Sequence, residues 1–261
     1  MKHALIIFAL LLFSCKHTQE NKTTDKNESE LVDAIPPENI RSYIHHVDPR
    51  DSLCLRDMKF AKAQIDSGRI VFTLQRGHGK FNTRQSKRLK QLCKRYNLTF
   101  GYDEITDGFE SKYERAGCYG AVMDEAIEKK FGKDFKKNLI READELIIAN
   151  NDTVNGYECD IEPEIYGLDS NRVIYLSTKE LKIKKNKQWK SINLYLNVYI
   201  DKSGKQSGHQ LILENTDNLN SEREKLFEIA IAELKKYQKC KPGEVLGKKV
   251  ITENYVTVVF D

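Results

Sequence analysis

The sequence lacks several features that mark common protein classes. Its longest uninterrupted apolar run, residues 4–13, has ten residues, about half of the ~20 that a membrane-spanning helix needs. This excludes a multi-span membrane protein. No two cysteines have the C-x-x-C spacing, so a zinc knuckle or a thioredoxin-like redox motif has no support. The 43 basic residues exceed the 39 acidic ones by only 4, a balance that does not indicate nucleic acid as a partner.

The sequence combines a high charge content with enough apolar residues to build cores. Charged residues make up 31 % of the 261 residues and hydrophobic residues 39 %, against roughly 25 % charged residues in an average soluble protein. At about 150 residues per domain, the length predicts one to two domains. The patterns described below predict an α+β fold, in which a small central α+β domain precedes a β-β-α-β module.

The start of the chain has the order of a secretory signal, with a short basic start, an apolar run and then a small residue. Leu12-Phe13-Ser14-Cys15 resembles the lipobox of bacterial lipoproteins, in which the cysteine is acylated and becomes the new N-terminus. The resemblance implies a signal peptide over residues 1–14 and a palmitate-bearing anchor on Cys15. The expected location is the cell envelope, at the outer membrane of a Gram-negative bacterium. The alternative is an ordinary signal peptide cut nearby, with Cys15 incidental.

Residues 15–37 are polar, and almost no apolar residue precedes Leu31. Such a segment buries too little apolar surface to offset the entropy of ordering it. We therefore expect a flexible tether between the anchor and the folded part of the chain.

Residues 38–150 are predicted to form the central domain. Apolar spacing predicts helices over residues 51–66, 113–131 and 134–149, and strands over residues 69–75 and 98–102. A further helix is predicted to begin at Asn82, which has Gln85 in the capping-box position. Cys93 and Cys118 lie on apolar helix faces and are expected to be packed thiols.

Several residues of this domain could carry chemistry, but each also has a structural explanation. Gly77-His78-Gly79-Lys80 could hold a phosphate but lacks the P-loop spacing. His45-His46 has no third metal ligand in view. Cys118 or Cys93 with His78 could form the nucleophile and base of an envelope enzyme, although no fixed spacing supports this pair. The prediction is a protein that is not an enzyme and has no metal or cofactor.

Charge is unevenly distributed along the chain. Residues 76–97 contain eight Arg or Lys and no Asp or Glu. Such a run could bind glycans or anionic headgroups beside a membrane, and the alternative is a solvated helix face. Glu158, Asp160, Glu162 and Glu164 form an acidic cluster without the glycine and spacing of a calcium-binding loop.

The C-terminal part has the clearest pattern. Residues 151–189 are a connecting β-rich segment. Residues 192–200 then alternate between apolar and polar, residues 201–204 have turn chemistry, and residues 210–214 give the returning strand. Ser221 and Glu224 form a capping box for an apolar helix, and residues 250–260 form a last strand rich in valine. Residues 190–261 are therefore predicted to form a β-β-α-β module.

This module resembles the TonB C-terminal domain family. The matching features are the strand that ends in residues 198–205, the helix with Ala230 and Leu234, Lys241-Pro242-Gly243, Gly247-Lys248 and the final strand. The resemblance implies that a protein partner adds a strand to the sheet edge near the last strand, with a possible link to outer-membrane transport. A TonB energy transducer also needs a retained membrane helix and a proline-rich spacer, whereas this chain has only 5 prolines.

The predicted binding surface is the final strand. Val256, Val258 and Phe260 share one face, expected to pack on the helix, and Tyr255, Thr257 and Val259 share the other. The residues predicted to bind the partner are Asn254, Tyr255, Val256, Thr257, Val258 and Val259. The alternative is an edge that is already covered by a hairpin over residues 172–184, since proteins commonly protect such edges.

Overall fold

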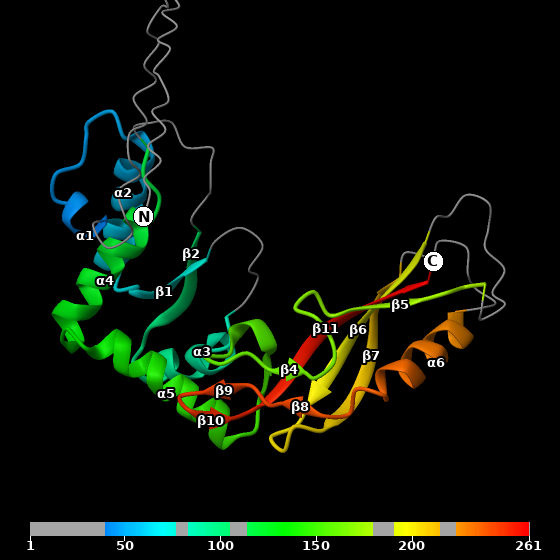
Figure 1. The fold of residues 1–261 in the computed structure, drawn as a ribbon. Coiled ribbons are helices and arrows are strands. Elements are labelled where there is room, and N and C mark those ends of the chain that lie inside the picture. The colour runs from blue at the N-terminus through cyan, green and yellow to red at the C-terminus, as the bar shows by residue number, and fades with distance from the viewer. Residues whose placement is uncertain (1–39, 77–82, 105–113, 180–190, 215–222, 261) are drawn as a thin grey trace, which may run out of the picture. The chain divides into compact units, whose positions relative to one another are not determined.

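The computed structural model describes residues 40–76, 83–104, 114–179, 191–214 and 223–260, which all belong to one compact unit, Ile35–Asp261. Figure 1 shows its helices and strands. The fold is α+β, as predicted. The expected signal peptide and tether lie outside the described residues. Within the described residues, no helix is long and apolar enough to cross a membrane.

The central domain is built on a small parallel sheet. Its elements are α1 (Ile40–Tyr43), α2 (Ser52–Asp66), β1 (Val71–Arg76), α3 (Ser86–Arg95), β2 (Thr99–Glu104), α4 (Cys118–Phe131) and α5 (Phe135–Ala149). β1 and β2 pair in parallel, with Val71 opposite Thr99, and α3 forms the crossover between them. Parallel strands need such a crossover because a tight turn can only reverse the direction of the chain.

Helices cover both faces of this sheet. Val71 packs with α1, α2 and the first half of α4, whereas its neighbour Phe72 packs with α3, α5 and Ile127 of α4. Neighbouring residues of a strand point to opposite faces, so consecutive apolar residues in β1 supply two separate clusters. A two-stranded sheet is marginal by itself, and burial on both faces is what makes this one stable.

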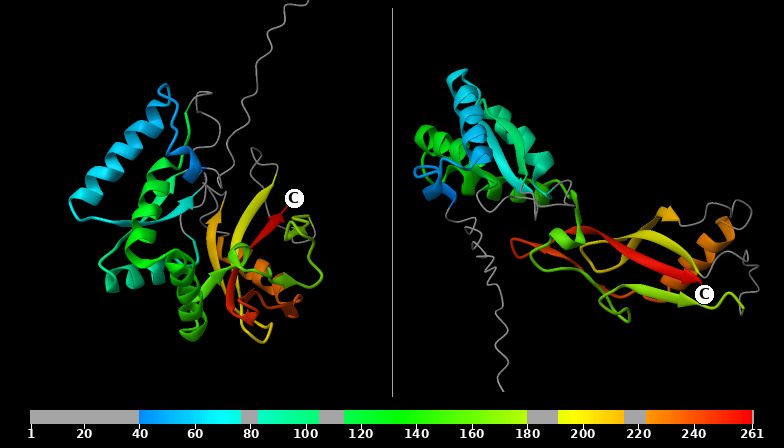
Figure 2. Two further views of the ribbon diagram at one scale, coloured as in Figure 1. Left: turned by 90° about the vertical axis from the view of Figure 1, so that its left-hand side faces the viewer. Right: turned by 90° about the horizontal axis from the view of Figure 1, so that it is seen from above.

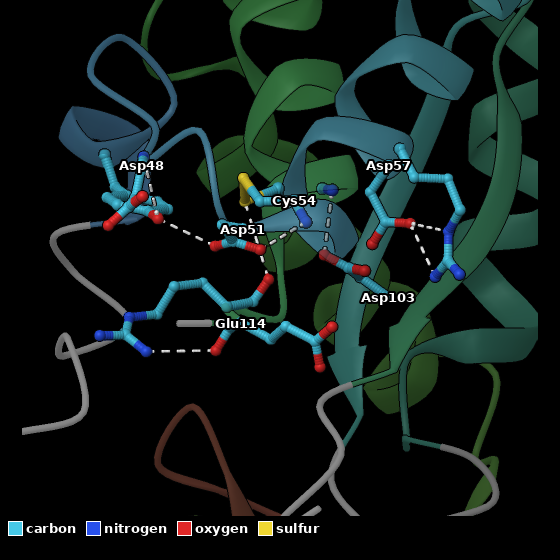
Figure 3. The surroundings of a disulfide bond; sticks show 11 residues. Asp48, Asp51, Cys54, Asp57, Asp103 and Glu114 are labelled. Atoms are coloured by element: carbon cyan, nitrogen blue, oxygen red, sulfur yellow. Dashed lines mark hydrogen bonds and ion pairs between the residues drawn. A yellow bond between two sulfur atoms is a disulfide. The ribbon is translucent and has the colours of Figure 1, made fainter. Parts of the chain in front are cut away.

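A disulfide joins the first turn of α2 to the start of α4, between Cys54 and Cys118 (Figure 3). Both cysteines are fully buried. Asp51 caps α2 by accepting a hydrogen bond from the Cys54 backbone N–H at 2.9 Å. The prediction of a packed thiol at Cys118 is wrong, because its sulfur is bonded. Among the described cysteines, Cys93 is a buried free thiol, as predicted.

The C-terminal part is built on a larger, mixed sheet. Its elements are β3 (Thr153–Asn155), the 3-10 turn η2 (Gly156–Glu158), β4 (Glu164–Ile165), β5 (Val173–Leu176), β6 (Ile192–Ile200), β7 (Gln206–Glu214), α6 (Arg223–Leu234), β8 (Cys240–Lys241), β9 (Glu244–Val245), β10 (Lys248–Lys249) and β11 (Ile251–Phe260). The main sheet has the order β3-β11-β6-β7, and β5 also pairs with β11. Figure 2 shows β11, in red, between the yellow β6 and the green β5.

One face of this sheet carries the core. Burial alternates without interruption along β6, and Leu196, Val198, Val256 and Val258 of the two central strands are buried. α6 packs on this face through a row of residues, Leu226, Ala230 and Leu234. The period of two predicted for β6 and β11 is confirmed, because only one face of each strand is apolar.

Several predicted boundaries differ from the observed ones. The helix expected from Asn82 begins at Ser86, and the helix expected from residue 113 begins at Cys118. β7 begins at Gln206, before the predicted residue 210. Asn82 and Ser221 lie outside the described residues. β3 and β5 belong to the main sheet, so the sheet extends beyond residues 190–261 into the segment predicted to connect the two domains.

Candidate functional site

The predicted partner-binding edge of β11 is largely occupied. β11 pairs with β6 on one side along Thr252–Phe260. On its other side it pairs with β3 at Ile251–Glu253 and with β5 at Thr257–Phe260. The Thr257 backbone N–H donates to the Arg172 carbonyl at 3.0 Å, so an amide expected to receive the partner is already satisfied. The open edge predicted along β11 is therefore wrong except at residues 254–256.

Arg172 helps to hold the covering segment in place. Its buried guanidinium donates to the Pro163 carbonyl at 3.2 Å and to Asn254 Oδ1 at 3.4 Å, and it lies 5.1 Å from the centre of the Tyr157 ring. Gly156 allows the close approach, because a Cβ there would lie 2.2 Å from Asn254 Oδ1. A buried guanidinium needs several acceptors, and β11 supplies one of them.

The six predicted binding residues thus divide by face. Tyr255 is 41 % exposed and Thr257 and Val259 are half-buried, as the alternation predicts. The side chains of Asn254, Val256 and Val258 are buried and cannot contact a partner. The alternative of a covered edge is supported in part, because β5 lies within residues 172–184. β5 pairs with β11, and residues 180–184 lie outside the described part of the chain.

β7 is one edge strand of the sheet, and β3 and β5 lie at the other edge. In the described part of the chain, β7 pairs with β6 alone; just before it, Lys205 forms an isolated bridge with Lys239, and beyond that bridge the outer side of β7 has no partner strand. The two strands have irregular register at Tyr195/Leu196 and at Tyr199/Ile200. Side chains along β7 include the exposed Ser207 and Ile212. An unpaired strand presents a row of N–H and C=O groups to another chain.

A cavity of 730 Å³ lies where β7 begins. It is lined by Tyr166, Ser203, Gly204, Lys205, Gln206, His209, Lys235, Gln238, Lys239 and Cys240. Gln206 Nε2 donates to the Tyr237 carbonyl at 2.7 Å and so ties the start of β7 to the segment after α6. The cavity therefore has one wall from the edge strand and another from the end of the helix.

This cavity is basic. No ion pair joins Lys205, Lys235 or Lys239 to a carboxylate among the described residues, and all three lysines are exposed. His209 Nε2 lies 2.9 Å from Gln206 Oε1. Burial lowers the pKa of His209, and the charge of Lys235 lowers it further. Exposed lysines with no carboxylate at ion-pair distance favour an anionic group. A carboxylate carried by a bound chain would find three cations here.

The structure gives no support to the other predicted sites. Cys118 is bonded to Cys54, and burial raises the pKa of the Cys93 thiol to about 12, so neither offers a thiolate at neutral pH. His78 and the rest of Gly77-His78-Gly79-Lys80 lie outside the described residues. His45 Nε2 lies 2.7 Å from Glu125 Oε1. No group of three metal-ligating side chains exists within the described ranges.

Four of the eight basic residues of the run pair with carboxylates. Arg84 lies 2.9 Å from Asp144 and 2.7 Å from Asp160. Arg88 pairs with Asp152 at 2.5 Å, and Arg95 pairs with Glu142. The predicted acidic cluster enters the same network through Asp160, whose Oδ2 accepts the Leu246 backbone N–H at 2.7 Å. These contacts join α3 to α5 and to the segment that follows it, which leaves less of the basic run for headgroups.

Sequence reasoning did not identify the β7 edge with its basic cavity. Lys205 lies 30 positions before Lys235 in the sequence, so no local pattern marks the lysines of the cavity as a group. The TonB resemblance directed attention to β11 instead. A scan against protein-family models, a search of curated proteins and a search of solved structures each found no match to this chain.

Proposed function

We propose that the chain is an envelope lipoprotein whose C-terminal sheet binds an extended segment of a protein partner by strand addition at β7. The observation that carries the proposal is the outer side of β7, which pairs with no strand among the described residues. In strand addition, main-chain hydrogen bonds supply affinity and alternate side chains supply specificity. At the other edge, β3 and β5 are short strands of 3 and 4 residues, whereas β7 offers 9 residues, so we place the added strand at β7.

The resemblance to the TonB C-terminal domain supports a binding role. An antiparallel β6–β7 hairpin, one helix on its apolar face and a long final strand are what this resemblance implies. The resemblance implies binding beside the last strand, β11, whereas we place the binding edge at β7, the second strand of the hairpin. A role as an energy transducer is not proposed, because the chain lacks the proline-rich spacer.

The basic cavity suggests the chemistry of the partner. A segment lying along β7 would pass His209 and end at the Lys205–Lys239 bridge, and all three of these residues line the cavity. We infer that this segment carries an acidic residue, or a chain-terminal carboxylate, at the position opposite Gln206. The partner would then be held by its main chain along β7 and by one charge at the end of the strand.

The lipid anchor is the second part of the proposal. Acylated Cys15 would keep the folded part of the chain within reach of partners at the membrane. Replacing Cys15 with Ala should leave an unprocessed precursor that incorporates no radiolabelled palmitate. Normal processing and labelling of that variant would remove the anchor from the proposal and leave strand addition untouched.

Site-specific photo-crosslinking tests the binding edge in living cells. A benzoyl-phenylalanine at Ser207 or Ile212 of β7 should give an adduct of one discrete size, because a partner strand would lie beside both positions. The same group at Thr257 of β11, which is paired on both sides, is the matched control and should give none. Adducts from Thr257 alone, or from no position, would contradict the proposal.

A further inference from the structure

A second cavity lies in the central domain, at the carboxyl ends of the parallel strands β1 and β2. It has a volume of 350 Å³ and is lined by Ile40, Arg41, Thr73, Leu74, Gln75, Asp103, Gly120, Ala121, Asp124 and Lys136. Ligands of open α/β sheets bind outside the carboxyl ends of the strands. The polar residues of this cavity come from α1, both strands, α4 and α5, so the whole domain contributes to it.

Asp103 is the central group of this cavity. Its side chain is 7 % exposed, and its Oδ2 accepts a hydrogen bond from the Gly120 backbone N–H at 3.0 Å (Figure 3). A Cβ on Gly120 would lie 2.3 Å from that oxygen, so glycine is required for this approach. No hydrogen bond from a described residue reaches the other oxygen, Oδ1. Thr73 is 2 % exposed, lies beside the same carboxylate, and its hydroxyl also has no partner in the described part of the chain.

The other charged side chains of the cavity each have an oppositely charged partner, although the buried Nε of Arg41 has no hydrogen-bond partner in the part of the chain that the structure describes. Asp124 and Lys136 pair at 2.6 Å, and Arg41 pairs with Glu128 at 2.8 Å. Asp103 has no cation within ion-pair distance among the described residues. The charge left without a counterion in this cavity is therefore a negative one.

The groups that face Asp103 add to this imbalance. They are Asp57 of α2 and Tyr119 of α4, Asp124 and Lys136 within the cavity, Arg41 at its rim, and the exposed Arg69, which lines a neighbouring pocket together with Asp103. Burial raises the pKa of Asp103 to about 6, the Gly120 N–H lowers it, Asp57 and Asp124 raise it, and Lys136 lowers it. A nearby cation would favour the ionised carboxylate, and neither Lys136 nor Arg69 lies within ion-pair distance of it.

A purely structural role explains only part of this arrangement. As a cap on the first turn of α4, Asp103 needs one acceptor oxygen, which an asparagine would also supply without a buried charge. Neither the second oxygen nor the unpartnered Thr73 hydroxyl contributes to that cap. Together they form a pair of acceptors at the wall of the cavity.

We propose that this cavity binds a small molecule through a primary ammonium group, which donates hydrogen bonds to Asp103 and Thr73 and supplies the missing positive charge. An ammonium has three donors and a compact charge, which suits two acceptors in a small space. Gln75 at the rim can hydrogen-bond to the rest of the molecule, and Leu74 and Ala121 contact its apolar part.

Binding of n-butylammonium to the full chain tests the proposal, with 1-butanol as the neutral probe of similar shape. The Gly120 amide signal in a ¹H–¹⁵N NMR spectrum reports directly, because this N–H donates to Asp103. n-Butylammonium should shift the signal with saturation, and 1-butanol should not. Equal shifts with both probes, or no saturable shift with n-butylammonium, would overturn the proposal.

Two further measurements separate binding from folding. Asp103→Asn should weaken n-butylammonium binding about tenfold or more, whereas Asp66→Asn removes a charge outside the cavity and should leave the affinity unchanged. If Asp103→Asn does not fold, the pH dependence of the unaltered chain decides. With a pKa of about 6, Asp103 is about 90 % ionised at pH 7 and about 10 % at pH 5. The affinity should therefore fall about ninefold between these values, and a constant affinity would overturn the proposal.

Discussion

The central domain and the C-terminal sheet reach stability by different means. The central sheet has two parallel strands of 6 residues, covered by helices on both faces and fastened by a disulfide. The C-terminal sheet has strands of 9, 9 and 10 residues, and one helix covers its apolar face. No disulfide is present among the described cysteines of that sheet.

This difference determines where each part can bind. A parallel sheet that is covered on both faces leaves only the ends of its strands open, and there the cavity around Asp103 lies. An antiparallel hairpin with one helix leaves a strand side open, and there β7 lies. The central domain is thus suited to a small molecule, and the C-terminal sheet to an extended chain.

Removing the disulfide should have the largest effect on the unfolding free energy, and this effect should be confined to the central domain. The bond closes a loop with a sequence separation of 64, for which loop-closure entropy predicts about 4 kcal/mol. We expect Cys54→Ala with Cys118→Ala to lower the unfolding free energy of residues 40–149 by that amount. Hydrogen exchange followed by mass spectrometry in increasing denaturant measures both regions at once. Cys159→Ala is the control, and equal losses in both regions would contradict their independence.

Creating a cavity in the C-terminal core with Leu196→Ala should have the next largest effect on the unfolding free energy. Leu196 is fully buried in β6 beneath α6, and Leu→Ala at such a site destabilises by about 3 kcal/mol. The loss should appear in the amides of β6, β7 and β11 and not in those of β1 and β2. Tyr175→Ala, at a side chain that is 70 % exposed, should change little. A shared loss across the chain would show that the two regions unfold together.

Asp103 should destabilise the central domain at neutral pH. Its folded pKa of about 6 lies above the ordinary value of 3.8, so the folded state binds the proton more tightly. The stability linked to that proton is fully present below about pH 4 and is lost as pH rises through 6. Asp103→Asn should therefore raise the unfolding free energy by about 3 kcal/mol at pH 7, and by little at pH 4. Chemical denaturation at both pH values measures this, and a destabilised variant at pH 7 would disprove it.

The smallest predicted effect compares two left-handed backbone positions, one in each region. Leu246 has φ 49° and Asn97 has φ 53°, and leucine tolerates this conformation less well than asparagine. Leu246→Gly should raise the stability of the C-terminal region by about 0.5 kcal/mol after the entropy of glycine is included. Asn97→Gly should change the central domain by less. Thermal unfolding of the two variants side by side gives the comparison, and a larger gain from Asn97→Gly would refute the argument.

The sequence predicted the strands and helices in which buried residues recur at one regular spacing. Residues 192–200 alternate because one face packs on α6, and the helix Ser52–Asp66 follows its apolar spacing and the Asp51 cap. β7 begins earlier than predicted, because Ser207, Gly208 and His209 on an edge strand have no apolar alternation. The Cys54–Cys118 pair could not be chosen among five cysteines from their order alone.

The candidate sites were less predictable because they depend on long-range contacts. β3 and β5 pair with β11 across some 80 to 100 positions, and strands of three and four residues have too little pattern to indicate a partner. Asp103 and Gly120 meet only after α4 packs against β2. Both binding surfaces form only when elements that are distant in the sequence pack together.

The central place of β11 in its sheet also determines when that sheet can assemble. A ribosome makes β3, β5, β6 and β7 before β11, yet β3, β5 and β6 each need β11 as a neighbour. The central domain has all its described strands and helices complete by Ala149 and can close early. β6 and β7 can pair with each other at once, but β3 and β5 have no partner strand until β11 is made, and during that interval their edges are exposed to aggregation. A newly made chain therefore passes through a stage in which the central domain can be folded while two strands of the C-terminal sheet still lack their neighbour.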